Sequence, residues 1–287
     1  MFRLFSKLAK ITFRFIIRLI KRIVFVQKQK RMQAKMLASY KAQQQMIEFL
    51  SIASHEFKTP LTSIKGNIQL IGRRLRNSVE IRSLSRQELL NRLTEAQELI
   101  EHTDQQLTRL TRFINILLES TRISNNTIDL FLEQCELNQV LDEVLQNRKQ
   151  LSTTRTIHVE HPDNKALATL VDISRIKQVI THYLSNAHKF SPIDQPIDVL
   201  LREQEEYAYV SIKDYGPGIP THEQEHIWER FYRVPGVKVL NSSEVGLGLG
   251  LHICRTFIER HKGQVGVQSE PGKGSTFWFT LPLFSQS

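Results

Sequence analysis

Apolar residues recur in two helical series along the first half of the chain, at alternating steps of three and four. Such steps keep the side chains on one face of an α-helix and are typical of heptad patterns. The polar stretch "RNSVEIRSLSR" separates the two series, so we expect an antiparallel helical hairpin. The first series contains Met46, Leu50, Ala53, Phe57, Leu61, Ile64, Ile68, Ile71 and Leu75, and the second contains Leu93, Ala96, Ile100, Thr103, Leu107, Leu110, Ile114 and Leu117.

One hairpin cannot bury its apolar seam alone. Two copies that pair would form a four-helix bundle, so the pattern predicts a homodimer. After about residue 125 the pattern changes to short strands alternating with helices, which is typical of one mixed sheet with helices on one face. The predicted fold class is therefore multidomain, an all-α hairpin that dimerises into a four-helix bundle, followed by an α/β sandwich.

The expected strands and helices of this second half follow one another along the sequence. "IDLFLEQCELNQVLDEVLQNRKQL" predicts a strand then a helix, "TIHVEH" and "ALATLVD" predict strands, and "ISRIKQVITHYLSNAHKF" predicts a helix. "PIDVLLREQEEYAYVSIKDYG" predicts a hairpin, followed by a loop that resembles a lid, a helix from about 247, and a last hairpin, "GQVGVQSEPGKGSTFWFTLP". We expect four regions: 1–27, 28–45, 46–122 and 127–285.

The net positive charge of the chain comes from its first 31 residues. Residues 1–31 carry ten cations and no acid, and this equals the net charge of +10 of the whole chain. The remainder is electrically neutral, which gives little support to direct nucleic-acid binding. Two cysteines lie far apart without a metal or disulfide pattern, which suits a reducing cytosol.

The basic segment 1–27 has cations too frequent for a transmembrane span. Its cations fall on one helical face and its aromatic and aliphatic residues on the rest, the pattern of a helix lying on an anionic membrane surface. The alternative is a helix that packs in a dimer or on a partner such as a separate sensor protein. We expect a cytoplasmic protein, or one peripheral on the inner face of the cell membrane. Residues 28–45 predict a helical connector, and no sensor domain is recognisable.

His55, in "SHEFKTPLTSI", is the first candidate for chemistry. It lies two residues from both Ala53 and Phe57, hence about 200° around the helix from each, so we expect it off the seam and exposed. An exposed imidazole has a nucleophilic nitrogen at neutral pH. Glu56 could hold the other ring nitrogen or accept its proton, and Pro60 should loosen the helix one turn later. A surface histidine alone indicates no function. A role in phosphate chemistry would require a phosphate donor bound elsewhere in the chain.

The second half contains four stretches suited to a nucleotide. In "NAHKF", the amide oxygen of Asn186 suits Mg²⁺ and Lys189 suits a phosphate, one helical turn apart. In "DYGPGIP", Asp214 can accept a hydrogen bond from an exocyclic amine, while Gly216 and Gly218 would let the backbone approach a flat base.

The other two stretches are "WERFYRV" and "GLGLGLHI". Arg230 and Arg233 of the first are candidate phosphate partners. Gly246, Gly248 and Gly250 of the second precede and enter a helix start, where free N–H groups bind phosphate. Each stretch taken singly is weak evidence, because turns, hinges and solvated helix faces share these compositions.

Taken in order, these stretches resemble the H, N, G1, F and G2 boxes of two-component sensor histidine kinases, over about residues 45–285. The resemblance implies a phosphoacceptor domain of the HisKA type and an ATP-binding domain of the GHKL or Bergerat type. It implies an autokinase that transfers the γ-phosphoryl of ATP to histidine and then to an aspartate of a cognate response regulator. ATP and Mg²⁺ are the implied cofactors.

The resemblance also implies roles for individual residues. His55 would be the phosphoacceptor, Glu56 its acid or base partner, and Thr59 lies where the family dephosphorylates the regulator. Asn186 would bind Mg²⁺, and Asp214 would read the adenine amine. The other implied nucleotide-binding residues are Lys189, Phe190, Gly216, Gly218, Arg230, Arg233, Gly246, Gly248, Gly250 and Thr276, with Thr276 supporting the base pocket.

The sequence departs from the family pattern at two positions. His182 stands where a second asparagine is common, four residues before Asn186, and Phe190 stands where tyrosine is common. Two alternatives therefore stay open beside an active, bifunctional kinase. One is a scaffold that holds ATP or a regulator without turnover, and the other is a related ATPase whose cycle drives conformational change. The acceptor histidine on a heptad hairpin argues against the ATPase.

Overall fold

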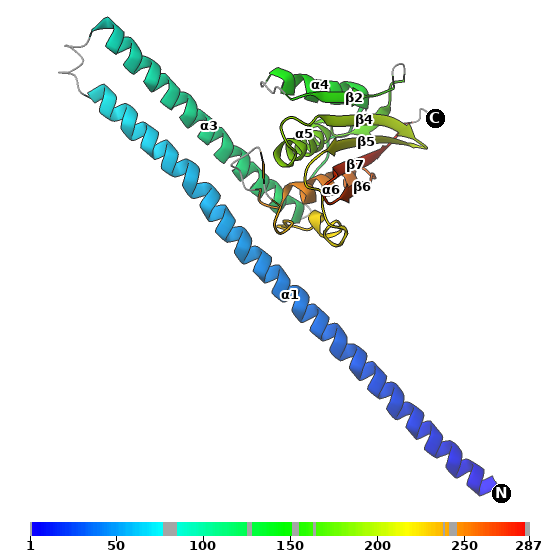
Figure 1. The fold of residues 1–287 in the computed structure, drawn as a ribbon. Helices are drawn as coiled ribbons and strands as arrows, with labels where there is room; N and C mark the ends of the chain where they lie inside the picture. The colour runs from blue at the N-terminus through cyan, green and yellow to red at the C-terminus, as the bar shows by residue number, and fades with distance from the viewer. Residues whose placement is uncertain are drawn as a thin grey trace. The chain divides into compact units, whose positions relative to one another are not determined.

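The computed structural model describes residues 2–76, 85–124, 128–150, 155–162, 165–237, 239–240 and 246–284. Two compact units divide the chain, residues 1–51 and residues 52–287. The first unit consists of the beginning of helix α1, which spans Phe2–Arg76 without interruption (Figure 1). The side chains of residues 1–24 lie outside those described, so the basic amphipathic face stays a prediction. Among the described residues, none of the helices has a stretch long and apolar enough to span a membrane.

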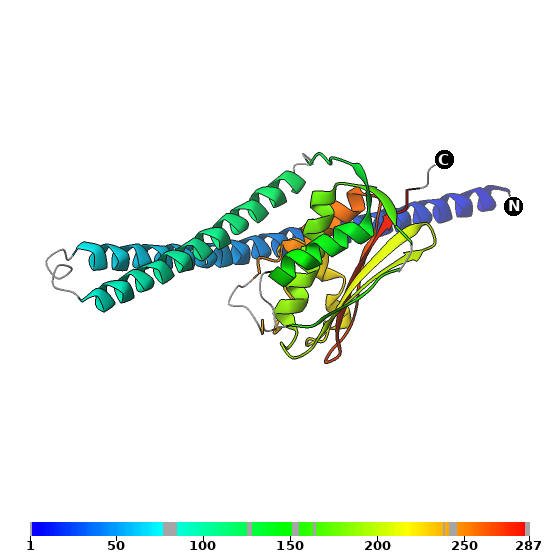
Figure 2. The ribbon, with the colours of Figure 1, turned by 90° about the horizontal axis from the view of Figure 1, so that it is seen from above.

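The rest of α1 and helix α3, Arg86–Ser124, run antiparallel as the predicted hairpin (Figures 1 and 2). Their connection, residues 77–84, lies outside the described residues. The rings of Phe57 and Phe113 meet edge to face, with their centroids 4.6 Å apart. Nearer the connection, the Asn67 amide donates to the Thr103 hydroxyl and to His102 Nδ1, each at 3.1 Å. Aromatic packing and a polar contact thus hold the two helices in register.

A capping box begins α3. The Ser85 backbone N–H and hydroxyl both donate to the Glu88 carboxylate, and the Glu88 N–H lies 3.3 Å from the Ser85 hydroxyl oxygen. These reciprocal bonds satisfy N–H groups that the first turn of a helix leaves without intrahelical partners. The hydrogen bonds from Ser85 also lower the pKa of Glu88.

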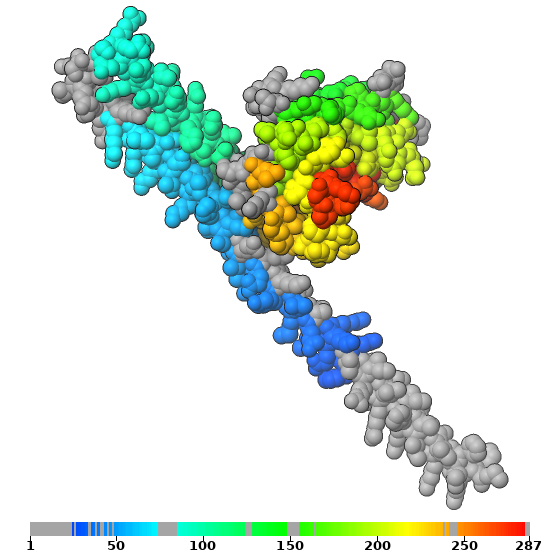
Figure 3. All heavy atoms as spheres, in the orientation of Figure 1, coloured from blue at the N-terminus to red at the C-terminus, as the bar shows by residue number. Residues whose placement is uncertain are grey.

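The heptad series divides between two faces of the hairpin. On α3 one heptad position is buried or half-buried, at Ala96, Thr103, Leu110 and Leu117. The other position is exposed, and Ile100 keeps 55% of its surface accessible. In Figure 3, side chains of the end of α1 (cyan) and of α3 (blue-green) lie against one another along the hairpin. We name the exposed set the outer stripe: Leu61, Ile68, Leu93, Ile100, Leu107 and Ile114.

The second half forms the expected α/β domain, and the predicted succession of strands and helices is confirmed. It contains two sheets rather than the single mixed sheet that we expected. The pair β1–β3 is antiparallel and meets the larger sheet through the isolated bridge Thr169–Leu283. The strands are β1 Glu133–Glu136, β2 Ile157–Glu160, β3 Ala168–Val171, β4 Ile197–Gln204, β5 Tyr207–Asp214, β6 Val265–Glu270 and β7 Gly274–Pro282.

The larger sheet has the order β2-β4-β5-β7-β6, in which only the β2–β4 pair is parallel. Helices α4, α5 and α6 cover one face of this sheet (Figure 2). The core between them includes the buried side chains of Tyr183, Phe257 and Phe279. Burial of each such side chain stabilises the fold by roughly 1.5 to 3 kcal/mol. The helices are α4 Leu137–Gln150, α5 Ile173–Phe190 and α6 Gly250–Arg260, and two 3₁₀ turns, Thr221–Glu223 and His226–Trp228, precede α6.

Arg155 fixes the end of α5 beside the end of β5. Its buried guanidinium donates to the backbone carbonyls of Ala187, His188 and Ser191, and to the Ser191 hydroxyl. The same hydroxyl accepts from the backbone N–H of Tyr215, the residue after β5. A cation at a helix C-terminus is favourable because the last carbonyls there lack intrahelical donors. This junction holds the C-terminal turn of α5 next to Asp214.

Candidate functional site

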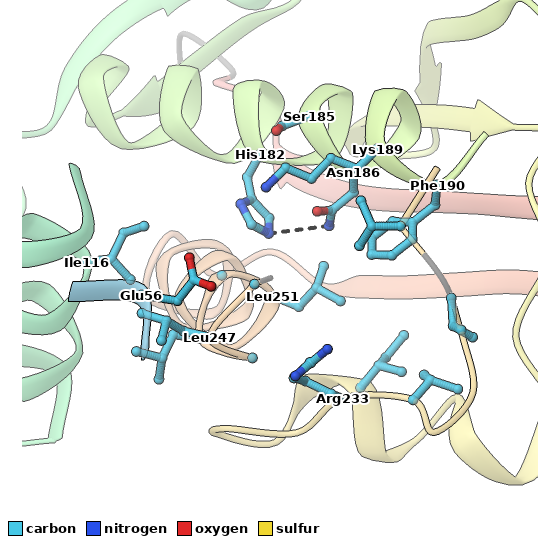
Figure 4. A pocket seen from close by; sticks show the side chains of 18 of the residues that line it. Glu56, Ile116, His182, Ser185, Asn186, Lys189, Phe190, Arg233, Leu247 and Leu251 are labelled. Carbon is cyan, nitrogen blue, oxygen red and sulfur yellow. Dashed lines mark hydrogen bonds between the residues drawn. The ribbon is translucent and has the colours of Figure 1, made fainter. Parts of the chain in front are cut away.

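A cavity of about 360 Å³ lies within the unit formed by residues 52–287 (Figure 4). This volume falls in the range of small-molecule sites. Side chains from α1 and α3 line one side, and α5, the end of β5 and the loop before α6 line the other. Four cations, Arg109, Arg112, Lys189 and Arg233, face it together with the carboxylates of Glu56 and Asp214. The excess of positive charge suits an anionic ligand.

The three residues predicted for catalysis all line this cavity. The imidazole of His55 is 78% exposed, as expected, and its Nδ1 lies 3.9 Å from Glu56 Oε1. Pro60 has no N–H and lies inside α1. The hydroxyl of Thr59, the residue before Pro60, donates to the His55 carbonyl one turn earlier, at 3.1 Å. The histidine therefore sits on continuous helix with one ring nitrogen near a carboxylate and its surface open.

Asn186, Lys189 and Phe190 reach the cavity from the last two turns of α5 (Figure 4). The Asn186 amide nitrogen donates to His182 Nε2 at 3.3 Å. Burial, with the nearby charges of Lys189 and Arg112, lowers the pKa of His182 to about 3. The imidazole is therefore neutral at physiological pH and accepts this hydrogen bond, and the Asn186 carbonyl oxygen stays available for a cation.

Asp214 ends β5 and faces the cavity from a nearly buried position, with 4% of its surface exposed. Burial raises the pKa of Asp214 to about 6, although N–H donors at Gly216 and Ser275 and the charge of Arg155 act in the opposite direction. The Gly216 N–H donates to Asp214 Oδ1 at 2.8 Å. At neutral pH this carboxylate is an ionised acceptor in an apolar recess, suited to an amino group of a ligand.

The glycines after Asp214 are required by contacts within the protein. A Cβ on Gly216 would lie 2.6 Å from the Phe190 carbonyl oxygen, and one on Gly218 would lie 2.1 Å from the Glu270 carbonyl oxygen. Gly218 also has a φ of +71°, which favours glycine. Only Gly218 of the two lines the cavity. Close approach to the protein's own backbone therefore already requires glycine at both positions.

All three predicted glycines before α6 line the cavity. Gly248 has a φ of +67° and its carbonyl accepts from the Phe231 N–H at 2.8 Å. Gly250 is the first residue of α6, whose N-cap makes no side-chain hydrogen bond to the helix. The first N–H groups of a helix lack intrahelical acceptors, which suits a phosphate. Residues 241–245 of the predicted lid lie outside the described residues.

Of three other predicted residues, Arg230 and Thr276 do not line the cavity. Arg233 lines the cavity, whereas Arg230 lies over the ring of Phe231, 4.5 Å from its centroid. Thr276 does not line the cavity, although we expected it to support the base pocket. It projects from the opposite face of β7, because neighbouring strand residues alternate between faces, and Ser275 lines the cavity in its place.

Sequence reasoning did not assign some of the lining residues to the site. The sequence alone did not distinguish them. The inward direction of Ser275 depends on the register of β7, and the apolar residues have the pattern of core residues. They include Gln106, Arg109, Arg112, Ser185, Ile219, Leu247, Ser275 and Phe277.

Two family models match the chain. The His Kinase A (phospho-acceptor) domain matches residues 45–126. The histidine kinase-, DNA gyrase B- and HSP90-like ATPase domain matches residues 171–285. The first match contains His55, and the second contains Asn186, Asp214 and the glycines before α6. The fold and the cavity thus define a class that joins a phosphoacceptor hairpin to an ATP-binding α/β domain.

The relatives include sensor protein kinases WalK from staphylococci. The protein of Staphylococcus aureus strain MRSA252 is 29% identical over 237 residues, which cover 82% of this chain and 36% of that protein. The protein of Staphylococcus saprophyticus is 28% identical over the same shares. This chain therefore spans about a third of the length of these relatives. Both domains of the chain thus match domains of two-component histidine kinases.

Solved structures share the fold. The histidine kinase AdeS of Acinetobacter baumannii superposes with a TM-score of 0.55 at 19% identity, covering 80% of this chain and 98% of that one. Full-length ShkA, solved in complex with AMPPNP, gives a TM-score of 0.54 at 22% identity, covering 84% of this chain and 46% of that one. The predicted fold class, a helical hairpin followed by an α/β domain, is confirmed.

Proposed function

We propose that this protein is an ATP-dependent histidine autokinase, in which His55 takes the γ-phosphoryl of ATP and passes it to an aspartate of a response regulator. The observation that carries the proposal is the cavity itself, because His55, Asn186 and Asp214 line one continuous space. Residues 46–122 would form the dimerisation and phosphoacceptor domain and residues 127–285 the ATP-binding domain. Residues 1–27 would be a membrane-surface or partner-binding helix, linked by 28–45.

The groups around the cavity fit ATP in three ways. Asp214 would accept from the adenine amino group in the buried recess. The N–H groups at the start of α6, with Lys189 and Arg233, would bind phosphates. The carbonyl oxygen of Asn186 is an oxygen ligand of the kind that Mg²⁺ prefers, and its amide nitrogen is already held by His182. Bound Mg²⁺ would neutralise phosphate charge during transfer.

His55 would act as the nucleophile. The carboxylate of Glu56 lies on the Nδ1 side of the ring, which favours the tautomer with its proton on Nδ1. Nε2 then carries the lone pair that forms the P–N bond while the bond between the γ-phosphorus and the ADP oxygen breaks. Phosphoryl transfer depends mainly on positioning and charge neutralisation, which the shared cavity supplies.

Two partners follow from this proposal. A second copy of the chain would cover the outer stripe, which leaves six large apolar side chains exposed on the hairpin. A response regulator would approach His55, whose ring is open to solvent. Thr59, one turn after His55 and facing the same cavity, would take part in dephosphorylating the regulator.

The test compares two labels. Purified protein is incubated with Mg²⁺ and either γ-labelled or α-labelled ATP, and the protein is then exposed to acid or alkali. We expect a covalent protein label from γ-labelled ATP alone. The label should be lost in acid and retained in alkali, as a phosphorus–nitrogen bond requires. Nucleotide binding without any label would contradict the kinase and favour a scaffold. Steady phosphate release without a labelled protein would favour the ATPase.

A further inference from the structure

His182 reaches the cavity from α5, one turn before Asn186 (Figure 4). The dashed line in the figure joins its Nε2 to the Asn186 amide nitrogen, and the two atoms are 3.3 Å apart. An amide NH₂ group can only donate, so Nε2 must accept and the ring proton must lie on Nδ1. This bond decides which end of the amide faces His182. The carbonyl oxygen is therefore the end left for another ligand.

A second observation shows that the ring itself is held in place. A Cβ built on Gly250 would lie 1.9 Å from His182 Cε1 and 2.2 Å from its Nε2. The three heavy atoms nearest to that Cβ all belong to this imidazole. Gly250 begins α6, so its backbone is helical and would accept alanine. The side chain of His182, rather than the backbone, therefore requires glycine at position 250.

We propose that His182 is a positioning residue for the divalent cation, and that glycine at position 250 leaves the space that the His182 imidazole occupies. The imidazole lies against the start of α6 and from there holds the Asn186 amide so that its oxygen, not its nitrogen, faces the cation. This inference rests on the proposed function, because it assumes that Asn186 binds Mg²⁺. It gives His182 an indirect role, since its Nε2 lone pair is engaged by Asn186 and cannot also bind a metal.

The hydrogen bond and the packing of the ring can be tested separately with two substitutions. His182→Gln keeps an acceptor within reach of the Asn186 amide, whereas His182→Leu fills space against Gly250 without an acceptor. Partners that orient a metal ligand typically contribute about 10- to 100-fold to metal affinity. Thr181→Ala is the control, because Thr181 is the exposed neighbour of His182 on α5.

The measurement is calorimetric binding of AMPPNP to the full chain, in EDTA and in a series of MgCl₂ concentrations. For His182→Leu we expect unchanged AMPPNP affinity in EDTA. The gain in affinity that Mg²⁺ provides should be about tenfold smaller than in the wild type. His182→Gln should retain most of that gain, and Thr181→Ala all of it. A His182→Leu protein that keeps the full gain would overturn the proposal. Equal losses in EDTA and in Mg²⁺ would also overturn it, because they would show a general role in folding or packing.

The match with Gly250 is tested by combining substitutions. Gly250→Ala should reduce the Mg²⁺-dependent gain in the wild-type background, where the new Cβ displaces the ring. In the His182→Ala background the same substitution should have little further effect, because the space is empty. Equal effects in both backgrounds would refute the match. If wild-type protein binds no AMPPNP, or gains nothing from Mg²⁺, the proposed function fails rather than this inference alone.

Discussion

At the scale of single residues, the environment of Asp214 has a consequence for stability. Its folded pKa of about 6 lies above the ordinary value of 3.8, so the folded protein binds this proton more tightly than the unfolded chain. Asp214 therefore supports folding below about pH 4, and that contribution is lost as pH rises through 6. The difference corresponds to about 3 kcal/mol, at 1.36 kcal/mol per pKa unit.

We predict that Asp214→Asn weakens adenine-nucleotide binding yet stabilises the nucleotide-free protein at pH 8 relative to wild type. The advantage should shrink as pH falls from 6 to 4, because the wild-type carboxyl then becomes neutral. Urea unfolding at several pH values measures this difference. A stability difference between the two proteins that does not change with pH would contradict a raised pKa at Asp214.

A second prediction concerns neighbouring residues on β7. Ser275 lines the cavity and its hydroxyl lies 2.9 Å from that of Ser269, whereas Thr276 projects from the other face. Ser275→Val should reduce nucleotide affinity by about tenfold, because it removes a hydroxyl and adds volume in a packed site. Thr276→Val should change the affinity by less than about twofold. Titration with fluorescent ADP distinguishes the two variants, and a larger loss from Thr276→Val would contradict the register.

These residues also show what sequence patterns can and cannot specify. His55, Asn186 and Asp214 were chosen from short motifs, and the structure places all three around one cavity. Thr276 was placed one residue away from the position that lines the site, because a motif does not reveal which strand face is inward. The contacts of Gly216 and Gly218 with the Phe190 and Glu270 carbonyls depend on tertiary packing, which short motifs do not contain.

At the scale of elements, heptad periodicity predicts both hairpin helices. It does not distinguish the face that packs inside the hairpin from the face that stays exposed. One set of positions packs inside the hairpin, and a second set forms the outer stripe. Steps of three and four hold both sets within one broad apolar face, so the pattern alone does not separate them. The strands of the α/β domain were found from their alternation, but their division into two sheets depends on long-range pairing that local patterns do not contain.

The outer stripe gives the prediction at this scale. Ile100→Glu should weaken self-association by about 2 kcal/mol or more, because the new carboxylate would be buried without a partner in the bundle. Gln105→Glu places the same charge at an exposed polar position of α3 and should leave association unchanged. Sedimentation equilibrium over a range of concentrations measures both. Equal association by Ile100→Glu and wild type would contradict pairing through the outer stripe.

At the scale of the whole molecule, we infer that His55 receives a phosphoryl group from ATP bound in the α/β domain. His222 is a suitable control because it resembles His55 in exposure and in the glutamate that follows it. Its side chain is 79% exposed against 78%, and it too is followed by a glutamate, with 3.3 Å between the two side chains. The two histidines differ in position, since only His55 of the pair lines the cavity.

The most direct measurement is the amount of acid-labile label taken from γ-labelled ATP by wild type, His55→Gln and His222→Gln. We expect labelling of wild type and His222→Gln to similar extents, and none of His55→Gln, with all three proteins binding nucleotide equally. Labelling that survives in His55→Gln, or that disappears in His222→Gln, would contradict His55 as the phosphoryl acceptor.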